Sequence, residues 1–216
     1  MQLRVHVPAH PFIGQLLTIC RDCNTPAPIF RSAVADLGRW LTYECCRDWL
    51  PVVETQVETP LEVVADAKLI DHTQPLAVVP VLRAGLALLE GALPLLPMAR
   101  VYHIGLKRDE ETLVAHCYLN KLPQKFEPGV RVLVLEPMLA TGGTLLQVLK
   151  ELYRRGADPQ LVRVISVLAA APALQKIAPL NPELAIYCAM IDEFLDDRAF
   201  IVPGLGDAGD RAFGTD

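Results

Sequence analysis

The stretch Val-Leu-Val-Leu-Glu-Pro-Met-Leu-Ala-Thr-Gly-Gly-Thr, residues 132–144, decides the fold of this chain. It begins as an apolar run, ends that run in the acid Glu136, and crosses a loop of small residues into a helical pattern. One face of that pattern carries Leu145, Leu149 and Leu152. We therefore predict a strand, a tight loop and a helix in direct succession.

Four apolar runs rich in β-branched residues share the character of that strand. They cover residues 76–82, 131–135, 161–168 and 184–190, and helical stretches separate them. Continuous apolar strands are typical of a parallel sheet that is covered on both faces. The alternation predicts an α/β fold with an open, mostly parallel, doubly wound sheet. Gly156 stands where a glycine would end the helix that follows residue 144.

The remaining segments give weaker patterns. Residues 1–30 hold four prolines in two near-pairs and are predicted to form an extended arm. Residues 101–122 suggest strands around an exposed polar loop. From residue 200 onward there is no periodicity, and fold physics alone predicts a loose tail. A helix is predicted after residue 30 and is expected to end at Pro51. Its apolar stripe consists of Val34, Leu37, Leu41, Cys45 and Trp49.

Composition limits the class of protein. Of 216 residues, 52% are hydrophobic and 21% are charged, which predicts a folded globule, and we expect a single domain over residues 1–216. The net charge is -5 with no basic block, which argues against nucleic acid as a partner. The longest near-candidate for a membrane span, residues 161–174, contains Arg163, Ser166 and Pro172 and is too short. With no apolar leader in the first residues, we expect a cytoplasmic protein.

The six cysteines include one pair at C-x-x-C spacing, Cys20 and Cys23. A redox site or a zinc site is one interpretation of that pair. No second pair of ligands at metal-like spacing follows it, so reduced, structural thiols are the favoured interpretation. Cys45 and Cys46 fall in a helical pattern and are expected to be small core residues.

The loop of residues 140–144 is the sharpest candidate binding feature. At the carboxyl end of a parallel strand, a helix start offers backbone N–H groups and its positive end to an anion. Two hydroxyls and a glycine pair lie within it, which suits a phosphate cradle. An ordinary strand-to-helix turn is the alternative. A Walker A loop is excluded, because no lysine follows the glycines.

Two other features are less specific. Arg83 follows the apolar run 76–82 and would face the same ligand edge, where an arginine suits phosphate, although a solvated surface arginine is equally consistent. Arg108 could belong to a solvated charged loop. Residues 204–209 match G-x-G-x-x-G by letters only, since seven residues remain after Gly209 and a dinucleotide fold needs a helix and an acid beyond it.

Taken in order, these pieces resemble the uracil phosphoribosyltransferase family, a branch of the type I phosphoribosyltransferases, over nearly the whole chain. The resemblance rests on Leu-Thr-Tyr-Glu at 41–44, Val-Pro-Val-Leu-Arg-Ala-Gly-Leu at 79–86, Arg-Asp-Glu-Glu-Thr-Leu at 108–113, Pro-Met-Leu-Ala-Thr-Gly-Gly-Thr at 137–144, Ile-Val-Pro-Gly-Leu-Gly-Asp-Ala-Gly-Asp at 201–210 and Phe-Gly-Thr at 213–215. The phosphate loop alone would resemble phosphoribosyltransferases in general, and residues 203–210 narrow the resemblance to the uracil-specific family.

The resemblance implies a role for each segment. Arg83 and Arg108 would neutralise pyrophosphate. The C-terminal segment, residues 200–216, would form a hood over the active site, with Ile201, Gly206 and Ala208 contributing mainly backbone groups to a uracil pocket. Asp207 would lie near the ribose, the metal waters and the base. The 5′-phosphate and ribose of phosphoribosyl pyrophosphate (PRPP) would be held by Glu136, Pro137, Met138, Leu139, Ala140, Thr141, Gly142, Gly143 and Thr144.

The family resemblance also implies the reaction. Uracil N1 would displace pyrophosphate from the ribose, giving UMP, with Arg83, Arg108, Glu136 and Asp207 as the catalytic set. Mg²⁺ would be bound mainly through PRPP and water, with no protein metal site. The partners would be uracil and PRPP, without nucleic acid or membrane, and the chain would form a homodimer or a higher homo-oligomer.

Some positions depart from the family pattern. The family has Asp where this chain has Glu136, whose carboxylate reaches one methylene further. Near Arg108 the family's Tyr-Arg-Asn becomes residues 107–109, Lys-Arg-Asp, and its Glu-Pro becomes residues 114–115, Val-Ala. Two alternatives therefore stay open: a regulatory protein of this fold that binds RNA, and a sensor of PRPP with little or no catalysis because of Glu136.

Overall fold

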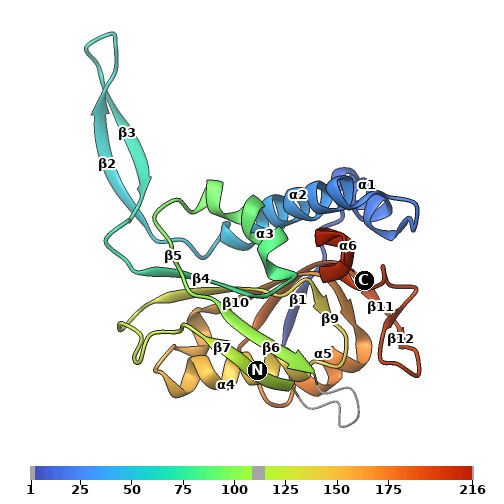
Figure 1. The fold of residues 1–216 in the computed structure, drawn as a ribbon. Helices are drawn as coiled ribbons and strands as arrows, with labels where there is room; N and C mark the ends of the chain where they lie inside the picture. The colour runs from blue at the N-terminus through green and yellow to red at the C-terminus, as the bar shows by residue number, and fades with distance from the viewer. Residues whose placement is uncertain (1–2, 109–114, 216) are drawn as a thin grey trace.

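A computed structural model describes residues 3–108 and 115–215 and has a nine-stranded sheet at its centre (Figure 1). The main path runs β1-β11-β10-β8-β4-β6-β7, while β5 pairs with β4 and β9 pairs with β10. Every pairing is parallel except β6 with β7. The strands are β1 Arg4–His6, β4 Leu76–Leu82, β5 Arg100–Val101, β6 Ile104–Arg108, β7 Ala115–Asn120, β8 Arg131–Leu135, β9 Met138–Leu139, β10 Val162–Ala170 and β11 Ala185–Asp192.

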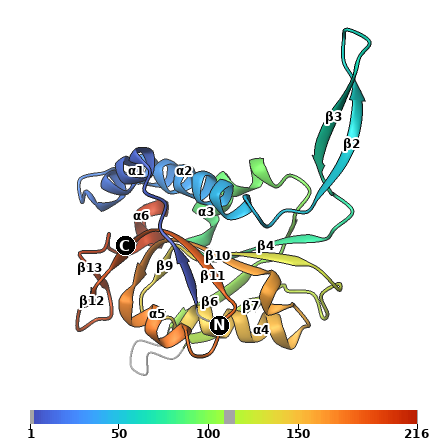
Figure 2. The same ribbon diagram turned by 180° about the vertical axis from the view of Figure 1, so that it is seen from behind.

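Helices cover both faces of this sheet, as a doubly wound fold requires (Figures 1 and 2). One face carries α1 Pro11–Arg21, α2 Ala27–Cys46, α3 Gly85–Ala92 and α6 Ala208–Phe213. The opposite face carries α4 Gly143–Arg154 and α5 Ala171–Ile177. Two short 3₁₀ turns, Leu93–Leu95 and Pro159–Leu161, lie in the connections.

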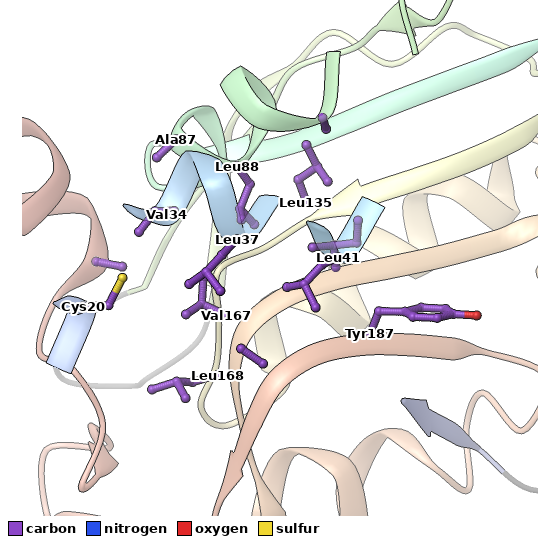
Figure 3. Packing of buried hydrophobic residues seen from close by; sticks show 14 of the residues in the cluster. Cys20, Val34, Leu37, Leu41, Ala87, Leu88, Leu135, Val167, Leu168 and Tyr187 are labelled. Carbon is purple, nitrogen blue, oxygen red and sulfur yellow. The ribbon is translucent and has the colours of Figure 1, made fainter. Parts of the chain in front are cut away.

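The alternation of side chains along the central strands explains the two layers. In β8, Leu133 and Leu135 belong to the core beneath α2, whereas Val132 and Val134 belong to the core over α4. All four are fully buried. In Figure 3, Leu37 and Leu41 of α2 lie against side chains of β10 in the first of these cores. The strands are apolar throughout because both of their faces are covered.

The strand predictions are confirmed. β4 and β8 have the predicted bounds, and β10 and β11 differ from the predicted runs by one or two residues. The helix after the phosphate loop is α4, with Leu145, Leu149 and Leu152 buried and Gly156 at φ +88° just beyond its end. The polar residues 109–114, expected to form a loop, lie outside the described residues.

The predicted extended arm at residues 1–30 is wrong, because residues 11–21 form α1. A proline is tolerated in the first turn of a helix, so Pro11 begins this helix instead of preventing it. The His10 side chain caps it by accepting from the N–H of Phe12 (3.2 Å). The helix α2 also ends at Cys46, five positions before Pro51, and Trp49 is buried in the turn that follows.

An antiparallel hairpin that the sequence did not predict, β2 Val52–Glu58 with β3 Val64–Ile70, projects away from the body of the molecule (Figure 1). Every residue of β2 is exposed. Its strands mix polar and aliphatic residues without regular alternation, and neither face is buried within this chain. Strand prediction from a single buried apolar face therefore could not detect this hairpin.

The C-terminal segment is ordered, and the expectation of a loose tail is wrong. Two short strands, β12 Phe194–Leu195 and β13 Ile201–Val202, precede α6. The Asp207 carboxylate caps α6, and Gly214 ends it at φ +65°. The hood packs on α2, with Ala208 and Ala212 buried in the same core as Phe30.

Within the parts of the chain that the structure describes, none of the helices combines the length and the apolar character needed to cross a bilayer.

Candidate active site

A cleft of about 640 Å³ lies at the carboxyl edge of the sheet, where β4 and β8 end and the hood begins. This is the edge at which open α/β sheets bind ligands. Four separate segments meet there: residues 81–84 at the end of β4, residues 106–107 of β6, residues 136–144, and residues 198–210. The lining includes Arg83, Glu136, Pro137, Met138, Ala140, Thr144, Ile201, Gly206, Asp207 and Ala208, all of them predicted site residues.

The phosphate loop has the geometry of an anion cradle. Gly142 occupies the N-cap position of α4 in the left-handed region, at φ +73°. A side chain there would be strained and would lie 3.3 Å from the carbonyl oxygen of Ala173. The first i to i−4 hydrogen bond of α4 runs from the N–H of Leu146 to the carbonyl of Gly142 (3.0 Å). The N–H groups of residues 143–145 precede it and sit at the positive end of the helix.

Not every residue of 136–144 can contribute in the same way. The side chain of Leu139 is 1% exposed and belongs to the core over α4, so only its backbone could meet a ligand. Gly142 is also buried. The N–H of Gly143 is 3.5 Å from the Thr141 hydroxyl, which keeps the loop turned tightly. The side chain of Thr144 faces the cleft.

Glu136 lies directly after β8, and its residue exposure is only 8%. Its N–H donates to the carbonyl of Ile165 in β10 (3.0 Å), which fixes the backbone beside the cleft. Glu136 lines the cleft, so its carboxylate belongs to the set of groups that could meet a ligand there.

Arg83 lines the cleft, and its side chain is half exposed. Its Nη2 donates to Asp210 Oδ1 (2.9 Å) and its Nη1 to the Thr215 hydroxyl (3.4 Å). The Thr215 hydroxyl also donates to Asp210 Oδ1 (2.7 Å). The turn after β4 is therefore tied directly to the end of the hood.

The predicted uracil-binding residues come together on one wall of the cleft. Ile201 and Ala208 are each 5% exposed, and Gly206 has φ +81°. Asp207 Oδ1 accepts from the N–H groups of Gly209 (2.8 Å) and Asp210 (3.0 Å). Asp207 thus starts α6 as well as lining the cleft, a structural role that an Asp before a short helix could have suggested.

Arg108 is the one predicted site residue that the structure does not place fully. Its backbone ends β6, but its side chain lies outside the described part of the chain. Several residues that line the cleft were missed as site candidates, among them Lys107, Arg198, Phe200 and Asp210. The guanidinium of Arg198 lies 5.1 Å from the centre of the Phe200 ring. Neither of these two had a sequence signal, because the segment around them has no periodicity.

The C-x-x-C pair does not have the character of a redox site. Cys20 is fully buried at the end of α1, whereas Cys23 is exposed. Burial raises the pKa of the Cys20 thiol to about 12, the opposite of the lowered pKa that reactive thiols show. Cys45 is a buried core residue, as expected, and Cys46 is partly buried. Over residues 3–108 and 115–215, no three His, Cys, Asp or Glu side chains group closely enough to hold a metal ion.

A mostly parallel sheet, a phosphate loop after a central strand and a separate hood over the same edge define the class: a type I phosphoribosyltransferase. The APRTase of Giardia lamblia shares this fold, with a TM-score of 0.52 at 14% identity over 75% of this chain and 81% of that one. A solved protein from Aquifex aeolicus matches with a TM-score of 0.85 and 37% identity over 97% of both chains.

The chain belongs to the uracil phosphoribosyltransferase family, whose model matches residues 7–215. It is 59% identical to the uracil phosphoribosyltransferase of Nostoc sp. over 215 residues, covering 100% of this chain and 99% of that protein. The predicted fold class, family and transferase activity are therefore confirmed.

Proposed function

We propose that this chain transfers the phosphoribosyl group of PRPP to N1 of uracil by using the cleft at the carboxyl edge of the sheet. One observation carries the proposal: residues of the phosphate loop and residues of the hood line the same cleft. From the loop these are Glu136, Pro137, Met138, Ala140 and Thr144, and from the hood they include Ile201, Gly206, Asp207 and Ala208. A cleft of about 640 Å³ lies within the usual range for small-molecule sites. Two substrates held side by side there would react with little further help, since positioning supplies much of the rate.

The phosphate loop would hold the 5′-phosphate and ribose of PRPP. Hydroxyls of Thr141 and Thr144 and the first N–H groups of α4 supply donors, and Glu136 supplies an acceptor for ribose hydroxyls. Arg83 and Arg108 would face the pyrophosphate. Because Arg83 now pairs with Asp210, pyrophosphate would compete with that carboxylate for the guanidinium. Charge that builds on the leaving group would meet these fixed cations.

The hood would read uracil through its backbone. Uracil N3 carries a hydrogen flanked by two carbonyl acceptors. The carbonyl of Ile201 is our candidate acceptor for N3–H, and the N–H of Gly206 is our candidate donor to a carbonyl. Ala208 would close the apolar side, and Asp207 would lie between base and ribose. Because the reading groups belong to the main chain, side-chain changes alone should not erase selectivity.

Mg²⁺ fits the donor set of the cleft as a partner of the substrate. Glu136, Asp207 and Asp210 line it, and carboxylate oxygens are ligands that Mg²⁺ accepts. Within the described residues no cluster could hold the ion alone, which favours binding mainly through PRPP and water. When bound, Mg²⁺ would neutralise charge on the departing pyrophosphate. Removal of divalent metal with EDTA should abolish UMP formation, and turnover that survives EDTA would contradict this part of the proposal.

We infer that the chain acts as a homodimer or larger oligomer in the cytoplasm. The hairpin exposes eight aliphatic side chains that the rest of this chain does not cover: Val52, Val53, Val57, Leu61, Val63, Val64, Leu69 and Ile70. A two-stranded hairpin with apolar faces in water is marginal, and a second copy could cover it. All six cysteines are free, which suits a reducing compartment. Light scattering should give at least twice the 23.7 kDa chain mass.

An assay of base selectivity tests the proposal. Uracil and 5-fluorouracil share the same hydrogen-bonding edge, so both should react with PRPP. Cytosine lacks the N3 hydrogen and has an amino group in place of one carbonyl. Sites built around such bonds discriminate by about 10⁴-fold or more. Comparable kcat/KM for cytosine and uracil would show that the hood is not the base reader, and PRPP binding without UMP formation would identify a sensor.

A further inference from the structure

The backbone N–H and carbonyl of Gly204, a residue of the hood, are both hydrogen-bonded to one partly buried ion pair. Its N–H donates to Asp192 Oδ2 (3.0 Å), and its carbonyl accepts from Arg21 Nη1 (2.8 Å). The same arginine makes a forked pair with Asp192, Nη1 to Oδ2 at 3.0 Å and Nη2 to Oδ1 at 2.6 Å. Asp192 is 5% exposed at the end of β11, and Arg21 is the last residue of α1.

Gly204 in turn packs against the carbonyl of Ile201, which is our candidate acceptor for uracil N3–H. A Cβ placed on Gly204 would lie 2.0 Å from the carbonyl oxygen of Ile201. The two main-chain positions are thus packed as closely as a glycine allows, and the backbone at Gly204 has φ +59°. A displacement of Gly204 would move the Ile201 carbonyl with it, because close-packed groups transmit shifts.

A second arginine holds the neighbouring residue of the hood against the same helix end. Arg211 of α6 donates to the carbonyl of Leu205 (2.7 Å) and to the carbonyls of Cys20 and Asp22. Its guanidinium lies 4.3 Å from the centre of the Phe30 ring, which fixes its orientation. Residues 204 and 205 are therefore both anchored to the end of α1.

We infer that Arg21 and Asp192 are positioning residues for the base-reading wall and so set the affinity for uracil. Among the described residues that line the cleft, neither appears, so they act through Gly204 and not by touching substrate. The inference rests on the proposed function of residues 201–206 as the uracil reader. Neither side chain bonds to residues 136–144, so the PRPP side of the cleft should not respond to their loss.

Steady-state kinetics of Arg21→Met, Arg21→Lys and Asp192→Asn test this inference. Loss of a charged hydrogen bond is worth about 1.4 kcal/mol or more, so Arg21→Met should raise the KM for uracil about tenfold or more. The KM for PRPP and kcat should stay within about twofold of the parent values. Arg21→Lys keeps the charge but not the fork, and it should fall between Arg21→Met and the parent protein.

Arg163→Met is the matched control, because Arg163 has carboxylate and carbonyl partners as Arg21 does and is more deeply buried. It donates to Asp48 Oδ1 (2.7 Å) and to the carbonyl of Cys45, far along β10 from the cleft. This variant should lose stability without a selective change in the KM for uracil. If Arg21→Met does not fold, Arg21→Lys and Asp192→Asn test the inference instead. In each of them the rise in KM for uracil is compared with the rise in KM for PRPP.

Three outcomes separate the possible errors. A rise in uracil KM below about threefold, or an equal rise in both KM values, would overturn the positioning role while the parent enzyme still makes UMP. Failure of the parent enzyme to use uracil would instead overturn the proposed function. A selective effect in Arg163→Met equal to that in Arg21→Met would show a general loss of stability and would also overturn the inference.

Discussion

Substitution of Gly204 by alanine is the sharpest perturbation that the hood offers. An alanine at φ +59° costs about 1–2 kcal/mol for its left-handed backbone alone. The new methyl group would start 2.0 Å from the Ile201 carbonyl oxygen and 2.9 Å from its carbon. Since such carbon and oxygen atoms rest about 3.3–3.6 Å apart, the two segments must separate by more than about 1 Å. Overpacking of this kind costs about 1–3 kcal/mol, so the total is about 2–5 kcal/mol.

Two glycines of the same conformation provide controls for Gly204→Ala. Gly206 has φ +81°, and the nearest atom to its added Cβ is Arg211 Cδ at 3.5 Å, an ordinary contact. Gly129 has φ +76°, lies in the turn before β8, and would meet nothing within 4 Å. Both alanine variants should carry only the backbone cost. The excess loss in Gly204→Ala, about 1–3 kcal/mol, therefore reports the contact with Ile201.

Urea unfolding and steady-state kinetics should be measured on all three variants. Gly204→Ala should lose the most free energy of unfolding and should raise the KM for uracil by more than about tenfold, with PRPP binding retained. Gly129→Ala should change stability but neither KM. If Gly204→Ala and Gly129→Ala have the same uracil kinetics, the Ile201 carbonyl is not the acceptor for N3–H, and the reasoning fails.

Three further predictions concern other parts of the molecule. Glu136→Asp should hold or raise activity, whereas Glu136→Ala should cost about 1–3 kcal/mol of PRPP affinity, and unchanged kinetics of the alanine variant would remove Glu136 from the site. Ala199 lines the cleft at φ +64°, so Ala199→Gly should raise the unfolding temperature by about 2–4 °C, and a lowered midpoint would contradict a strained backbone. Cys20 has a pKa raised to about 12 by burial and stays a protonated thiol below that pH, so iodoacetamide at pH 8 should modify Cys23 in the native protein and Cys20 only after unfolding. Peptide mass spectrometry identifies the modified cysteine, and modification of Cys20 in the native protein would contradict this prediction.

The sheet could be predicted from sequence because its signal is local. β4 and β8 read as apolar runs, since most of their side chains belong to one of the two cores. The phosphate loop could be predicted for the same reason, as strand, glycine pair and helix lie within residues 131–154. Arg83 was open to two interpretations because it is far from Glu136 along the chain. The sequence alone does not show that the two residues line the same cleft.

The first 30 residues show where a local rule misled. Prolines at Pro8 and Pro11 suggested extended backbone, yet Pro11 stands in the first turn of α1, where its missing N–H costs nothing. The apolar stripe Ile13, Leu17 and Cys20 recurs at helical spacing and is buried in the core. Weighing that stripe above the prolines would have found the helix.

The hood could not be predicted from local physics, because its order comes from bonds to the opposite end of the chain. Arg21 and Gly204 are 183 positions apart, and Arg211 and Cys20 are 191 apart. Without these partners, the glycines at 204 and 206 would leave a flexible backbone. Two arginines and Asp192 remove that freedom and aim main-chain groups at the cleft. In our proposal the end of α1 supports the base-reading wall from behind, since among the described residues none from α1 lines the cleft. Changes in the first 22 residues should therefore affect the recognition of uracil before they affect the binding of PRPP.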